Sequence, residues 1–114
     1  MQSNNKYKLI LDVQEPYLGY IKSGKKVVEG RLGKQKYLDL QKGDIIKINN
    51  LEIEVLGVTK YSGFKEMLIM EGVKNVVPDA KDLEEAVNVY YKFYTKQDES
   101  QYGVAAISIK VMVS

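Results

Sequence analysis

Residues 45–61 read IIKINNLEIEVLGVTKY and predict a β-hairpin. One strand is expected over 45–48 and a second over 51–61, because β-branched and aromatic residues are frequent in both segments. Asn49 and Asn50 between the strands suit a tight turn. Apolar side chains occur on both faces of the second strand, which suits a strand in a small β-barrel.

Outside the hairpin, three more strands and three helices are expected. The strands fall over residues 6–13, 26–32 and 104–113. The helices run from Pro16 to Gly24, from Ser62 to Gly72 and from Asp79 to about Thr95. Polar loops are expected over 33–36 and 97–103. The pattern predicts an α+β fold, a small, mostly antiparallel β-barrel with flanking helices, in a single domain over residues 1–114.

The composition excludes several kinds of chemistry. The chain contains no cysteine and no histidine, which rules out disulfides, thiolate or imidazole metal sites, and Ser-His-Asp or Cys-His catalysis. No metal and no cofactor are expected. A hydrophobic fraction of 45% and a charged fraction of 28% are typical of a soluble globular protein. Without an apolar run of membrane-spanning length or a signal-like N-terminus, a cytoplasmic monomer is the simplest expectation.

Positive charge is concentrated in the first half of the chain. The formal net charge is only +2, yet eight basic residues lie between Lys22 and Lys47, against three acidic residues. After residue 61, carboxylates outnumber lysines. This distribution is typical of a face that binds a polyanion. The alternative is that the lysines only solvate the surface.

Arg31 is the only arginine in the chain. Its planar guanidinium can hold a carboxylate, a phosphate or a base edge with two parallel hydrogen bonds, which lysine cannot do. In a strand, Glu29 and Arg31 share one face, and Lys26 lies close by in sequence. The spacing therefore indicates a small polar site, with a surface salt bridge on a strand edge as the alternative.

The nine tyrosines fall into two groups. Tyr90, Tyr91 and Tyr94 occur at helical spacing and are expected to pack in the core. Tyr61 and Tyr102 instead occur at strand–loop junctions, where either could stack on a base or line a pocket. The glycines complete no phosphate-binding motif, so they are expected to serve turns and close backbone approach.

Several separated blocks resemble one known family. They include Ser23-Gly24, KKVVEGR at 25–31, KGDII at 42–46, Glu66-Met67-Leu68, VVP at 76–78, residues 90–94 and YGVAAI at 102–107. In this order and spacing the blocks resemble the ASCH domain, the activating-signal-cointegrator homology domain, over nearly the whole chain. That domain is similar to the PUA fold, a small β-barrel with flanking helices.

The resemblance implies binding of RNA or a nucleotide-like ligand in a cleft built around the block G-x-K-x-x-E-x-R. In this chain the block is matched by Lys26, Glu29 and Arg31, and Lys60 and Tyr61 should border the same cleft. Together with the basic segment and the tyrosines, the expected binding residues are Lys22, Lys25, Lys26, Glu29, Arg31, Lys34, Lys60, Tyr61 and Tyr102.

Two other functions remain open. Some bacterial relatives hydrolyse the acetyl amide of N4-acetylcytidine with a threonine nucleophile three residues after the block lysine. Here Glu29 occupies that position, and a carboxylate cannot replace a hydroxyl nucleophile directly. If the protein is such a hydrolase, Glu29 would activate water with Lys26 as electrostatic support. The third possibility is a protein-interaction domain with a vestigial cleft.

Overall fold

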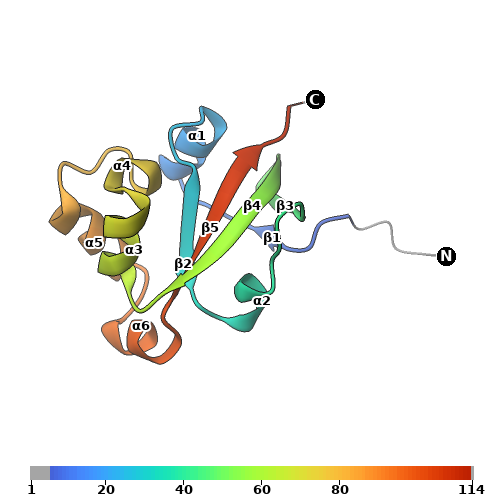
Figure 1. Ribbon diagram of the computed structural model, residues 1–114. Helices are drawn as coiled ribbons and strands as arrows, with labels where there is room; N and C mark the ends of the chain where they lie inside the picture. Colours follow the sequence, from blue (N-terminus) through green and yellow to red (C-terminus); the bar gives the residue numbers. More distant parts are fainter. Residues whose placement is uncertain (1–5, 114) are drawn as a thin grey trace.

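The computed structural model describes residues 6–113 and shows a mixed α+β fold around one five-stranded sheet (Figure 1). The sheet order is β1-β3-β4-β5-β2. β1 pairs with β3 in parallel, and the three other pairings are antiparallel, so the expectation of a mostly antiparallel sheet is confirmed. The strands are β1 (Ile10–Leu11), β2 (Val28–Leu32), β3 (Ile45–Ile48), β4 (Leu51–Tyr61) and β5 (Val104–Val111).

The predicted hairpin is present as β3 and β4, which pair from Ile48 with Leu51 to Ile45 with Glu54. Asn49 in the turn adopts a positive φ of 54°, a conformation that asparagine tolerates better than most residues. A register shift between Val55 and Gly57 marks a bulge in β4. The first strand is shorter than expected, because only residues 10 and 11 of the predicted segment pair with β3.

Six helices connect the described strands: α1 (Tyr17–Lys22), α2 (Gln35–Leu38), α3 (Phe64–Glu71), α4 (Val73–Val76), α5 (Leu83–Tyr91) and α6 (Lys96–Tyr102). The loop predicted over 97–103 is wrong, since most of it forms α6. Thr95 caps this helix by accepting a hydrogen bond from the Asp98 amide. α6 buries none of its residues, so it has no apolar periodicity by which it could be predicted.

The sheet is covered on both faces. One core cluster joins the sheet to α3, α4 and α5 through residues such as Phe64, Met67 and Ala86. The other cluster lies on the opposite face and includes Ile21 of α1 and Tyr37 of α2. β5 serves both, because its buried side chains alternate between the clusters. No helix in the described part of the chain is long and apolar enough to cross a membrane.

The expected closure of the sheet into a barrel is not confirmed. Within residues 6–113, β1 and β2 form the two edges and do not pair with each other. A side chain links the edges instead: Arg31 of β2 donates from Nη2 to the carbonyl oxygen of Asp12, which follows β1, at 3.0 Å. The two-residue length of β1 leaves little backbone available for a strand-to-strand ladder.

Candidate functional site

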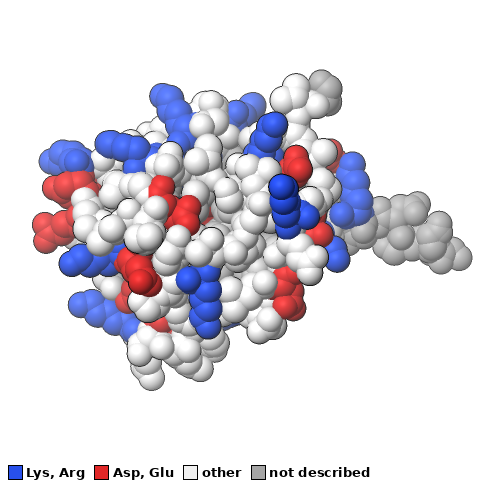
Figure 2. All heavy atoms as spheres, in the orientation of Figure 1, with Lys and Arg blue, Asp and Glu red and all other residues white. Residues whose placement is uncertain are grey.

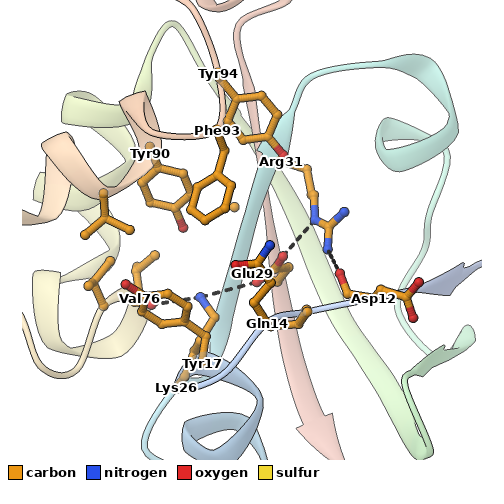
Figure 3. Close-up of a pocket in the computed structure, with 14 residues that line it drawn as sticks. Asp12, Gln14, Tyr17, Lys26, Glu29, Arg31, Val76, Tyr90, Phe93 and Tyr94 are labelled. Carbon is orange, nitrogen blue, oxygen red and sulfur yellow. Dashed lines mark hydrogen bonds and ion pairs between the residues drawn. The ribbon is translucent and has the colours of Figure 1, made fainter.

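A cavity of about 340 Å³ lies beside the edge strand β2 (Figure 3). Its size is at the lower end of the range of small-ligand pockets, roughly 300–1,000 Å³. β2, the segment over residues 12–14 after β1, and Tyr17 of α1 supply part of its lining. The rest comes from residues at the end of α4 and along and after α5. The pocket therefore opens where the two unpaired sheet edges face the helices.

Three charged side chains predicted to share one site do line this one cavity: Lys26, Glu29 and Arg31. Arg31 Nε lies 2.7 Å from Glu29 Oε2, and Lys26 Nζ lies 3.3 Å from Glu29 Oε1. The predicted shared face of Glu29 and Arg31 is thereby confirmed. The side chains of Lys26 and Glu29 are 3% and 9% exposed, so the surface salt-bridge alternative is wrong.

Gly30 explains how β2 can lie so close to the helices. A Cβ atom at this position would lie 2.8 Å from Tyr90 Oη and 2.9 Å from Met67 Sδ, which are both closer than van der Waals contact. Glycine thus lets α3 and α5 approach the strand between the two charged residues. The close approach places Tyr90 beside the charged pair and forms one wall of the pocket.

Lys26 holds the floor of the pocket together. Its ammonium donates at 2.7 Å to the carbonyl oxygens of both Val28 and Val76, and it pairs with Glu29. Three acceptors match the three N–H groups of an ammonium, whereas a neutral amine has only two. Burial lowers the pKa of Lys26, and the Glu29 carboxylate opposes this effect. Because its donors are occupied within the protein, the expectation that Lys26 contacts phosphate is wrong.

Arg31 keeps part of its hydrogen-bonding capacity. Burial acts to lower the pKa of Arg31, but the charge and hydrogen bond of Glu29 raise it overall, so the guanidinium stays charged. Nε donates to Glu29 and Nη2 to Asp12. Since a guanidinium has five N–H groups, three have no recorded acceptor within residues 6–113. The Tyr37 ring lies 6.0 Å from Arg31 Cζ and supports its plane.

Aromatic side chains form the wall above this floor. Tyr90 and Tyr94 stack on Phe64 at ring-centroid distances of 4.5 and 5.4 Å, which confirms the prediction that they pack against the core. Both also line the cavity, together with Tyr17 and Phe93. Burial raises the pKa of Tyr90 well above its ordinary value, so its phenol stays protonated.

The sequence reasoning missed Phe93 and Gln14, which both line the pocket. Phe93 lies outside the apolar stripe of α5 and is 51% exposed, and this break in periodicity is a signal the sequence does contain. Gln14 lies in the segment between β1 and α1, near Glu29 in Figure 3. Nothing in its sequence context marks it.

The remaining predicted residues do not line this pocket. Lys22 and Lys25 are exposed at the end of α1. Lys34 Nζ lies 5.3 Å from the ring centroid of Tyr102, so these two residues form a separate contact. The expectation that Lys60 and Tyr61 border the same cleft is wrong: they belong to β4, and β5 lies between β4 and β2.

Tyr61 has a structural partner. Its hydroxyl donates to Glu71 Oε2 at 2.5 Å, and its ring packs against the core cluster of α3 and α5. The hydrogen bond with Glu71 raises the pKa of Tyr61 to about 12. These contacts hold the end of β4 against α3, which is reason enough for a tyrosine at this strand–helix junction.

Comparison with known proteins agrees with this architecture, a small α+β domain with a charged pocket beside an edge strand. The model of the ASCH domain matches residues 11–112, and the chain belongs to the ASCH domain family. No curated protein shows significant similarity to it.

Two solved structures resemble the chain over most of its length. The crystal structure of the hypothetical protein PH0355 is 44% identical, with a TM-score of 0.87 over 91% of this chain and 98% of that one. The solution NMR structure of protein PF0455 from Pyrococcus furiosus is 38% identical, with a TM-score of 0.78 over 93% and 98%.

Proposed function

We propose that this protein binds RNA by taking up one unpaired nucleobase in the pocket beside β2. The ASCH family is often linked to RNA binding. The observation that carries the proposal is the combination of a charged floor, Glu29 and Arg31, with a wall of Tyr17, Tyr90 and Tyr94. Unpaired bases are recognised by hydrogen bonds to their edges and by stacking on aromatic rings.

The charges on the floor favour the edge of a base over a phosphate. Glu29 lies between Lys26 and Arg31, so a phosphate that reached the floor would meet a carboxylate. The edge of a base carries both donors and acceptors. It can donate to Glu29 while it accepts from the remaining N–H groups of Arg31, and its faces then pack against the aromatic wall.

Phosphate contacts are proposed to lie outside the pocket. Lys22, Lys25 and Lys34 are exposed and form no ion pair with a described residue. Lys60 and Tyr102 are proposed to contact RNA at a greater distance from the pocket. Affinity should fall with salt if such contacts contribute, since each neutralised phosphate of a single strand adds about −0.7 to the slope of log K against log salt.

The hydrolase alternative receives less support from the geometry. Among the described residues that line the pocket, the hydroxyl groups belong only to Tyr17, Tyr90 and Tyr94, so the serine or threonine nucleophile of a covalent route has no counterpart. Only attack by water, assisted by Glu29, would remain. Both oxygens of Glu29 already face cations.

The test compares nucleoside binding by the wild type and two pocket variants, followed by calorimetry. Glu29→Gln removes the carboxylate, and Val89→Trp fills the cavity without changing a charge. We expect each variant to weaken binding at least about tenfold, the value of one charged hydrogen bond. The proposal fails if no nucleoside binds, or if both variants, shown to be folded, bind like the wild type. Release of acetate from N4-acetylcytidine, lost in Glu29→Gln, would instead establish the hydrolase.

A further inference from the structure

We infer that the rim formed by Phe93, Lys92 and Lys96 holds the nucleotide next to the one in the pocket. The natural partner is then single-stranded RNA and not a free nucleoside. The inference rests on the proposed function and extends it from one base to a chain. Its starting point is Phe93, which lines the pocket although it is 51% exposed.

Phe93 is held at the mouth of the pocket by the local backbone. α5 ends at Tyr91, and the amides of Phe93 and Tyr94 both donate to the carbonyl oxygen of Tyr90 at 3.0 Å. The chain turns here, so Tyr94 packs inward against Phe64 while Phe93 stays half exposed. Figure 3 shows the Phe93 ring beside Tyr90 at the cavity. A half-exposed ring at this place offers apolar surface both to a base inside and to one outside.

Lysines flank this ring in sequence. Lys92 precedes Phe93 directly, Lys96 follows three residues later, and both are exposed. Neither forms an ion pair with any residue of the described chain. Lys96 Nζ lies 5.5 Å from the ring centroid of Tyr91, which holds it close to the end of α5. Cations interleaved with exposed aromatic rings are the usual platform for single-stranded nucleic acid.

Acidic side chains limit the direction that the RNA chain can take. Asp82, Glu84 and Glu85 form the N-terminal turn of α5 and share a shallow hollow with Lys92. A phosphate that ran toward this end of α5 would be repelled. The strand is therefore expected to leave the pocket over Phe93 toward Lys96 at the start of α6.

The test measures the ratio between the affinity for an RNA hexanucleotide and the affinity for the nucleoside of the same base. For the wild type we expect the hexanucleotide to bind at least about tenfold tighter, since one more stacked base and its phosphates contribute. Phe93→Leu and the double variant Lys92→Ser/Lys96→Ser should each reduce this ratio several-fold. Any loss that is common to both ligands cancels in the ratio.

A matched double variant controls for charge. Lys42→Ser/Lys110→Ser removes two exposed lysines that line neither pocket, and it should leave the ratio near its wild-type value. The salt slope of hexanucleotide binding should fall by about 1 in the Lys92/Lys96 variant and less in the control. Thermal unfolding confirms that each variant is folded.

The outcomes separate this inference from the proposal that underlies it. If the wild type binds nucleoside and hexanucleotide equally well, or if the rim variants and the control change the ratio alike, the rim inference is overturned and the pocket proposal stands. If no nucleoside binds and Glu29→Gln does not affect the hexanucleotide, the pocket proposal itself fails. A DNA hexanucleotide that binds as tightly as RNA would overturn the assignment of RNA as partner.

Discussion

Lys26 Nζ lies 2.7 Å from the carbonyl oxygen of Val76, fifty positions further along the chain. This bond ties the C-terminal end of α4 to the pocket floor, and the same ammonium also holds Val28 and Glu29. A lysine that reads from sequence as a ligand contact is therefore a buried brace. It fixes Glu29 in position, and any ligand meets the carboxylate and Arg31 rather than the ammonium.

Replacement of Lys26 should destabilise the protein strongly. Lys26→Met keeps the apolar stem but leaves the Glu29 carboxylate and two carbonyl groups without their buried partner. Removal of one member of a buried ion pair costs about 3–5 kcal/mol. We expect a loss of about 3 kcal/mol in the free energy of unfolding, measured with urea. Lys25→Met, at the exposed neighbour, should change it by less than about 0.5 kcal/mol. Equal stability of the two variants would contradict the role of Lys26 as a brace.

Gly30 provides a test of the close approach between β2 and the helices. In Gly30→Ala the new Cβ would lie 2.8 Å from Tyr90 Oη, so Tyr90 and Met67 must move. Overpacking of this kind costs typically about 1–3 kcal/mol, and nucleoside affinity should fall with it because Tyr90 lines the pocket. Gly57→Ala is the matched control, since no atom lies within 4 Å of its Cβ position. A melting temperature equally affected in both variants would show that the effect is not steric.

Particular residues show how far the sequence predicts this molecule. The period of two in a strand was enough to place Glu29 and Arg31 on one face, because that rule depends only on local backbone geometry. The position of Lys60 relative to the pocket was wrong, because it depends on which strands are neighbours, and the order β4-β5-β2 is a long-range property. The burial of Lys26 likewise depends on Val76, which is distant in sequence.

Tyrosine ionisation should weaken the fold at high pH. Hydrogen bonds to Glu71 and Glu99 raise the pKa values of Tyr61 and Tyr91 to about 12, from an ordinary value of 10.0. Above pH 10 the unfolded chain therefore releases protons that the folded chain retains, so the free energy of unfolding falls as pH rises toward 12. Phenolate absorbance of the native protein should report the delayed ionisation. Tyr61→Phe/Tyr91→Phe should flatten the pH dependence; an unchanged slope would exclude these two residues as its source.

Arg31→Lys retains the positive charge and tests whether the shape of the guanidinium matters. One guanidinium donates to Glu29 and, across the two sheet edges, to Asp12. A lysine ammonium lacks this planar fork. We expect the bond to Asp12 to be lost, at about 1–3 kcal/mol of unfolding free energy for a charged hydrogen bond. Nucleoside affinity should fall at least about tenfold, because the remaining N–H groups that would face the base edge also disappear.

Two measurements on Arg31→Lys separate these effects. Urea unfolding reports the link between the edges, and calorimetry with a nucleoside reports recognition in the pocket. Since Glu29 retains a cationic neighbour in this variant, a loss of affinity cannot come from charge alone and points to the geometry of the fork. If Arg31→Lys binds the nucleoside as the wild type does, Arg31 acts only as a counter-charge for Glu29. The base edge would then have to be recognised by Glu29 together with another polar group of the lining, of which Gln14 is the nearest candidate in the segment after β1.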